Sequence, residues 1–210
     1  MKLTLESLKA ENFGWHELPG GHHIRSNEFP GDVWDIVYHK NKSTLNDYYK
    51  IFTHFTPESV FEIGVMEGGS LVLWNTLFNC KVVGVDCTSV NFTPSFRKYQ
   101  RKETCDVGKQ DIVTIILDVY NAGHLDEVAD REFPEGIDFI VDDGPHDIRS
   151  MRSNFNVLWP KLKKGGFYSI EDWQALPPKH IIELYDVLDR VATLDGVSTI
   201  TYPNFIGIHK

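Results

Sequence analysis

SVFEIGVMEGGS (residues 59–70) reads as a buried strand, a glycine-rich turn and the start of a helix. Glu62 is the one charged residue of the strand, and Gly64, Gly68 and Gly69 lie in the turn. Glycine permits positive φ and a close approach to the backbone. Because open α/β sheets bind ligands at the carboxyl ends of their strands, this turn is a candidate ligand site.

Further strands and helices are predicted to alternate along the rest of the chain. Short apolar stretches with the character of buried strands lie at 81–87, 111–118, 138–144 and 165–172. Helical stretches are expected at 45–55, 70–78, 94–104, 121–130, 147–162 and 181–194. Such alternation is typical of a parallel sheet with helices on both faces.

The C-terminus departs from this alternation. VSTITYP and NFIGIHK are both strand-like and meet at Pro203–Asn204, which favours an antiparallel hairpin. We therefore predict an α/β, Rossmann-like fold with a mostly parallel seven-stranded sheet and an antiparallel C-terminal hairpin. This is the architecture of class I methyltransferases.

The N-terminal segment differs in character from the rest. We predict a cap or lid over residues 1–44 and the main domain over 45–210. Glycines and prolines interrupt the first 43 residues, which we expect to be irregular. The segment is rich in aromatic and histidine residues, which are Trp15, His16, His22, His23, Phe29, Trp34 and Tyr38. They either close over a ligand or pack as a simple cap.

Composition narrows the function classes. A net charge of −9 argues against general affinity for nucleic acid. Three cysteines, Cys80, Cys87 and Cys105, form no CxxC pair, so neither a disulfide framework nor a zinc site is indicated. No apolar run suits a signal peptide or the ~20 residues of a membrane span. We expect a cytoplasmic protein that acts on a small molecule, and leave homo-oligomer formation open.

An acidic residue follows the glycine-rich turn after about twenty residues. Asp86 ends the second predicted strand, where a carboxylate commonly holds the ribose hydroxyls of an adenosine group. The spacing Gly64-x-x-x-Gly68-Gly69 lacks the G-x-G-x-x-G of dinucleotide sites, so S-adenosylmethionine is favoured over NAD. Asp118, after the third strand, is placed to reach the adenine amino group. The candidate cofactor-binding residues are Glu62, Gly64, Gly68, Ser70, Asp86, Asp118 and Asp142.

Acidic residues also end two neighbouring predicted strands. Asp143 follows one, and Glu171 and Asp172 end the next. Carboxylates this close repel one another unless a cation lies between them. An all-oxygen set suits Mg²⁺, Mn²⁺ or Ca²⁺ rather than zinc. We therefore predict Asp143, Glu171 and Asp172 as metal ligands.

His146 lies three residues after Asp143, beside this predicted metal site. With an unperturbed pKa of ~6.5, it is a candidate general base that takes the proton of an acceptor hydroxyl during methyl transfer. The alternative is a surface residue at a helix start. Asp142 has three open roles: contact with the methionine end of the cofactor, support of the metal, or a helix cap.

The motifs that carry these residues are FEIGVMEGGS, VVGVD, DFIVDDGPH, NVLWPKLKKGGFYSIEDW and YPNFIGIHK. Through them, residues 45–210 resemble the macrocin and sugar O-methyltransferases of natural-product biosynthesis, with cephalosporin-hydroxylase-like proteins as near relatives. The resemblance implies Mg²⁺ on Asp143, Glu171 and Asp172, His146 as base, and a sugar acceptor. Catechol-type O-methyltransferases are similar in layout. A non-catalytic S-adenosylmethionine-binding scaffold is the alternative from another class.

Overall fold

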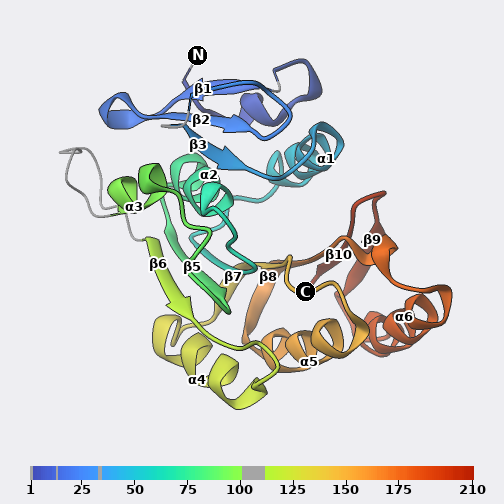
Figure 1. The fold of residues 1–210 in the computed structure, drawn as a ribbon. Helices are drawn as coiled ribbons and strands as arrows, with labels where there is room; N and C mark the ends of the chain where they lie inside the picture. The colour runs from blue at the N-terminus through green and yellow to red at the C-terminus, as the bar shows by residue number, and fades with distance from the viewer. Residues whose placement is uncertain (1, 13, 33–34, 101–111) are drawn as a thin grey trace.

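The structure, a computed structural model, describes residues 2–12, 14–32, 35–100 and 112–210. Within these residues seven strands form one sheet in the order β6-β5-β4-β7-β8-β10-β9 (Figure 1). They are β4 (Ser59–Ile63), β5 (Lys81–Asp86), β6 (Ile112–Ile116), β7 (Ile137–Asp142), β8 (Leu162–Glu171), β9 (Ser198–Thr201) and β10 (Phe205–His209). β4 to β8 are parallel, and β10 pairs antiparallel with β8 and β9. The predicted sheet and hairpin are confirmed.

Helices cover both faces of this sheet (Figure 1). They are α1 (Lys42–Phe52), α2 (Gly69–Phe78), α3 (Pro94–Gln100), α4 (Ala122–Glu132), α5 (Ile148–Leu158) and α6 (Pro178–Ala192). The start of three is fixed by a side chain that accepts a backbone N–H of the first turn: Asn41 for α1, Asn121 for α4 and Asp147 for α5. In the described part of the chain, no helix combines the length and apolar character needed to cross a bilayer.

The side-chain alternation of β4 divides the core in two. Phe61 and Ile63 pack with α4, α5 and α6, whereas Val60 packs with α1 and α2. All five residues of β4 are buried, which explains why the strand is mostly apolar. Glu62 is the one charged residue in it, and its carboxylate is nevertheless fully buried.

The N-terminal segment forms a second, small sheet, so the expectation of irregular structure is wrong. Its strands are β1 (Trp15–Glu17), β2 (His23–Ser26) and β3 (Ile36–Tyr38), in the order β1-β2-β3. Short 3-10 helices accompany them at Leu5–Leu8, Ala10–Asn12 and Pro19–Gly21. Strands of three or four residues, separated by glycines and prolines, are too short to show an alternating pattern. Expectations for Trp34, Cys105, residues 101–104 and residue 111 fall outside the described residues.

This small sheet packs directly on the main domain. Ile24, Ile36 and Tyr38 share one buried apolar cluster with α1 and α2. At the start of α2, a Cβ on Gly69 would collide with the carbonyl of Val37 in β3. The predicted boundary between residues 44 and 45 lies inside α1.

We expect Gly69→Ala to lower the free energy of unfolding by about 1 to 3 kcal/mol, because the added methyl group must push β3 away from α2. Gly123→Ala, in the first turn of α4, is the matched control: the nearest atom to its Cβ would be 3.6 Å away. It should leave stability unchanged or raise it by up to about 1 kcal/mol. Urea denaturation measures both, and equal stability of the two variants would contradict the packing described.

Candidate active site

A cavity of about 440 Å³ opens at the carboxyl ends of the central parallel strands. One wall is the glycine-rich turn after β4, and another is formed by residues that follow β7 and β8. The third wall comes from the N-terminal segment, where His39, Lys40 and Asn41 join β3 to α1. The cavity therefore lies where ligands bind in sheets of this kind.

The structure brings most of the predicted site residues to this cavity. Those that line it are Gly64, Ser70, Asp86, Asp143, His146, Glu171 and Asp172. Four others lie away from its surface. Glu62 and Asp142 are buried, Gly68 is close to the ring of Phe96, and the Asp118 carboxylate accepts the backbone N–H of Tyr120 at 3.0 Å.

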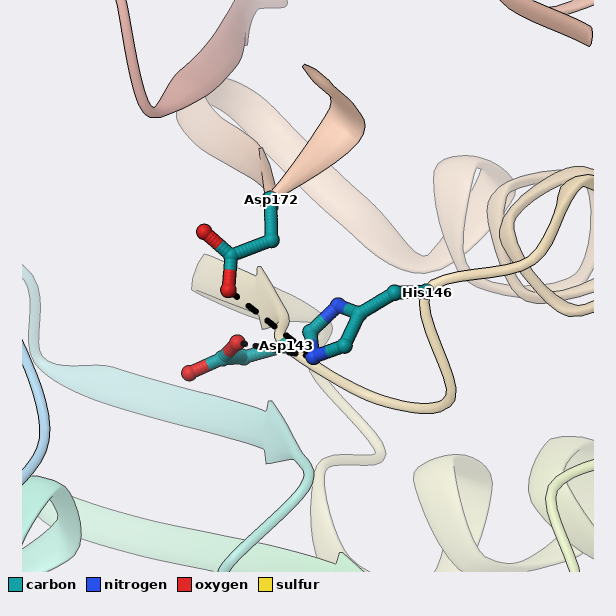
Figure 2. Close-up of side chains that lie close together, drawn as sticks. All are labelled: Asp143, His146 and Asp172. Atoms are coloured by element: carbon teal, nitrogen blue, oxygen red, sulfur yellow. Dashed lines mark ion pairs between the residues drawn. The ribbon is translucent and has the colours of Figure 1, made fainter. Parts of the chain in front are cut away.

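Asp143, His146 and Asp172 all line this cavity. Figure 2 shows that their side chains point toward one another. Nε2 of His146 is 3.9 Å from Asp143 Oδ1 and 3.9 Å from Asp172 Oδ2. One ligand atom from each residue lies within 4.8 Å of the other two. Divalent ions bound at ~2.1 to 2.5 Å hold opposite ligands at most ~5 Å apart. The Asp143 and Asp172 carboxylates therefore lie close enough to share one divalent ion, with the His146 imidazole beside them.

Strained backbone borders the same cavity. Met66, His146 and Asp172 have φ of 49°, 54° and 52°, in the left-handed region that non-glycine residues rarely adopt. Each such residue costs of order ~1 kcal/mol or more, and such residues cluster at functional sites. Nothing in the sequence indicated these conformations. They support a functional role for this cavity independently of its carboxylates.

Sequence reasoning missed the residue at the centre of the carboxylates, Lys40. Its Nζ is 2.6 Å from Glu171 Oε1, 3.1 Å from Asp143 Oδ2 and 3.6 Å from Glu62 Oε1. The side chain is only 2% exposed. Burial alone would lower the pKa of Lys40, but the surrounding carboxylates outweigh burial and hold the pKa above its usual range. A cation of the chain itself therefore lies among these carboxylates, in addition to the divalent ion that the sequence predicts there.

Glu171 is fixed by a second donor. The Tyr48 hydroxyl donates to Glu171 Oε1 at 2.7 Å, on the same oxygen that Lys40 contacts. Oε2 is the oxygen that these two donors leave free. Glu171 does not belong to the compact group of Asp143, His146 and Asp172, although it lines the same cavity.

Asp86 organises the glycine-rich turn. Its Oδ2 accepts the backbone N–H groups of Val65 and Met66 at 2.9 and 3.0 Å, and its Oδ1 accepts that of Thr88 at 3.1 Å. The carboxylate is therefore held in place at the cavity wall. This fixed acceptor fits the ribose hydroxyls of an adenosine group.

The glycines of the turn serve a purpose that the sequence did not indicate. Gly64 has φ +87°, and a Cβ there would collide with the Asp143 carbonyl. Gly68 has φ +89°, and its Cβ would collide with the Phe96 ring. These glycines let protein segments, rather than only a ligand, approach the turn. Gly64 in this way joins the turn to the loop that carries Asp143.

Asp142 is buried below the cavity. The Asn154 amide donates to its two carboxylate oxygens at 3.2 and 3.3 Å, and the Tyr168 hydroxyl lies 3.4 Å away. Burial raises the pKa of Asp142 to about 7, although these donors oppose the shift. Asn154 Oδ1 finds no hydrogen-bond donor among the described residues. Burial likewise raises the pKa of Glu62 to about 7.

The raised pKa of Asp142 predicts a pH dependence of stability. The folded state keeps the proton up to pH about 7, whereas the unfolded chain releases it near ~4, so this contribution to stability is lost as the pH rises between these values. Asp142→Asn cannot ionise. Measured by urea denaturation in EDTA, its stability relative to the unmodified chain should rise by about 2 to 3 kcal/mol from pH 5 to pH 8. A difference that stays constant over this range would show that Asp142 does not titrate as described.

The chain is similar in sequence to known methyltransferases. Residues 61–173 match a family described as a methyltransferase domain. Demethylmacrocin O-methyltransferase of Streptomyces fradiae is 30% identical over 62% of this chain and 32% of its own length. Mycinamicin VI 2''-O-methyltransferase of Micromonospora griseorubida is 33% identical over 57% of this chain and 28% of its own length. The chain thus spans about a third of the length of these relatives.

A solved structure shows the same fold. A methyltransferase from the mycinamycin biosynthetic pathway, in complex with Mg, SAH and mycinamycin VI, superposes with a TM-score of 0.61 at 24% identity. The match covers 82% of this chain and 50% of that one. The predicted Rossmann-like methyltransferase fold is therefore confirmed.

Proposed function

From the premise that the chain belongs to the methyltransferase-domain family, we propose that it is an S-adenosylmethionine-dependent, divalent-metal-assisted O-methyltransferase. Its acceptor is a hydroxyl group of a small molecule, in the first instance a sugar or glycoside. One observation carries this proposal: Nε2 of His146 lies 3.9 Å from both Asp143 and Asp172, in a cavity that Asp86 and the glycine-rich turn also line.

The metal site of the proposal consists of oxygen ligands on two adjacent strands. Asp143, Glu171 and Asp172 would hold Mg²⁺ or Mn²⁺, with the Oε2 atom of Glu171 as the free oxygen of that residue. When bound, the divalent ion polarises an acceptor hydroxyl and lowers its pKa. Lys40 and Tyr48 hold the Glu171 carboxylate in position for this role.

His146 acts as the general base. Nε2 of its imidazole faces the two carboxylates, whose negative charge stabilises the imidazolium formed when His146 takes the hydroxyl proton. The acceptor oxygen then forms its bond to the methyl group as the bond from that methyl group to the sulfonium breaks, and S-adenosylhomocysteine leaves. Because the charges of the reactants cancel in this step, the chain contributes mainly alignment of the groups.

The cofactor lies, in this proposal, along the turn between β4 and α2. Asp86 accepts the ribose hydroxyls, while Gly64 and Ser70 lie at the cavity wall nearby. Glu62, Gly68 and Asp142 do not line the cavity, and their contact with the cofactor stays a prediction. Contact between Asp118 and the adenine amino group stays a prediction.

A sugar acceptor is supported by the names of the relatives. Two of them are demethylmacrocin O-methyltransferase and mycinamicin VI 2''-O-methyltransferase. A third is named for a substrate that carries a rhamnosyl sugar, 8-demethyl-8-alpha-L-rhamnosyl tetracenomycin-C 2'-O-methyltransferase. A cytoplasmic location, homo-oligomer formation and closure of the N-terminal segment as a lid stay predictions.

Methyl transfer tests the proposed function. With S-adenosylmethionine carrying a labelled methyl group, Mg²⁺ and a set of sugars and glycosides, we expect label in at least one acceptor. EDTA should abolish transfer and excess Mg²⁺ should restore it, because the ion lowers the pKa of the reacting hydroxyl. Transfer that persists in EDTA would contradict the metal site. Binding of S-adenosylhomocysteine without transfer to any acceptor would favour a non-catalytic scaffold.

His146→Ala separates the base from cofactor binding. We expect kcat to fall by about 10²- to 10⁴-fold, since the hydroxyl proton loses its acceptor. Calorimetry should show S-adenosylhomocysteine bound within about threefold of the unmodified chain. His54→Ala is the matched control, because His54 is exposed and does not line the cavity, and it should leave kcat unchanged. An unaltered kcat in His146→Ala would exclude His146 as the base.

A further inference from the structure

Lys40 places a fixed positive charge inside the proposed metal site. Its Nζ contacts carboxylates that come from three different strands: Glu62 in β4, Asp143 directly after β7 and Glu171 at the end of β8. Glu62 and Glu171 are buried and Asp143 is half-buried, and carboxylates this close together in such surroundings repel one another without a cation among them. In the chain alone, the Lys40 ammonium is the cation that they share.

The backbone on both sides of Lys40 is held in place by close packing and by a helix cap. Tyr38, two residues earlier, is 2% exposed in the core, and β3 packs against Gly69 without space for a Cβ. On the other side, the Asn41 side chain accepts the Thr44 backbone N–H at 2.9 Å and so begins α1. With its backbone anchored on both sides and its side chain buried, Lys40 is held next to Asp143 and Glu171 in the chain alone.

We propose that Lys40 is a resident counter-cation of the metal site. It keeps the carboxylates assembled when no divalent ion is present, and its charge weakens the binding of the ion when one enters. This inference rests on the proposed function, because the ion concerned is the one assigned there to Asp143, Glu171 and Asp172.

The proposal differs from an ordinary structural ion pair in one measurable way. A structural ion pair contributes the same stability with and without a metal ion. A resident counter-cation is coupled to the ion, because both neutralise the same carboxylates. Removal of the Lys40 ammonium must therefore strengthen metal binding while it weakens the metal-free fold.

Mn²⁺ binding to the full chain, followed by the electron paramagnetic resonance signal of the free ion, tests this coupling. We expect Lys40→Met to bind Mn²⁺ at least about tenfold more tightly, since a unit positive charge a few ångströms from a divalent ion is removed. Lys81→Met is the matched control. It removes a lysine that is ion-paired with Glu132 at 3.0 Å and does not line the cavity, and it should bind Mn²⁺ within about twofold of the unmodified chain.

Melting temperatures give a second readout. In EDTA, Lys40→Met should melt below the unmodified chain, and saturating Mn²⁺ should raise its melting temperature by more than it raises that of the unmodified chain. If Lys40→Met does not fold in EDTA, the double variant Lys40→Met/Glu62→Gln removes one buried carboxylate together with the ammonium. It should still bind Mn²⁺ about tenfold more tightly than Glu62→Gln alone.

The outcomes separate this inference from the proposed function. Mn²⁺ binding that is unchanged or weaker in Lys40→Met, and in the double variant against Glu62→Gln, overturns the counter-cation while the metal site stands. An unmodified chain that binds no Mn²⁺ overturns the metal site and, with it, this inference. Tighter binding in the lysine variants together with a larger melting shift supports the proposal.

Discussion

The ammonium of Lys40 links the N-terminal segment to the carboxyl ends of three neighbouring parallel strands. Glu62 and Glu171 lie within β4 and β8, and Asp143 directly follows β7. Burial of the Glu62 and Glu171 carboxylates costs several kcal/mol each unless a cation compensates it. Lys40 supplies that compensation from the N-terminal segment, with a side chain 2% exposed. The carboxyl end of the sheet can therefore carry a dense set of acidic groups and still be part of a packed core.

The small N-terminal sheet belongs to the active site for the same reason. Gly69 lets β3 pack on the first turn of α2, and this packing fixes the backbone that leads to Lys40. On the opposite wall, Gly64 lets the glycine-rich turn pack on the backbone of Asp143. The cofactor turn, the acidic loops and the N-terminal segment are thus held together by close backbone contacts. Left-handed backbone at His146 and Asp172 shows that this arrangement is maintained against local strain.

The sequence predicted those features that follow from regular patterns. Buried parallel strands read as apolar runs, and the carboxyl ends of parallel strands meet at one edge, so the convergence of Asp143 with Asp172 was predictable. The small N-terminal sheet was not predictable, because strands of three residues carry no periodicity. The position of Lys40 among the carboxylates was not predictable either, since 103 residues separate it from Asp143 and 131 from Glu171. A lysine between His39 and Asn41 has no local signal that distinguishes it from a surface lysine.

A crystal structure of the chain with Mn²⁺ and S-adenosylhomocysteine, with anomalous scattering recorded for manganese, tests the central claim most directly. The account predicts a manganese peak beside Asp143 and Asp172 while the Lys40 ammonium stays in contact with Glu171. An ion that displaces the Lys40 side chain from the carboxylates, or a bound cofactor product with no manganese peak among them, would contradict it.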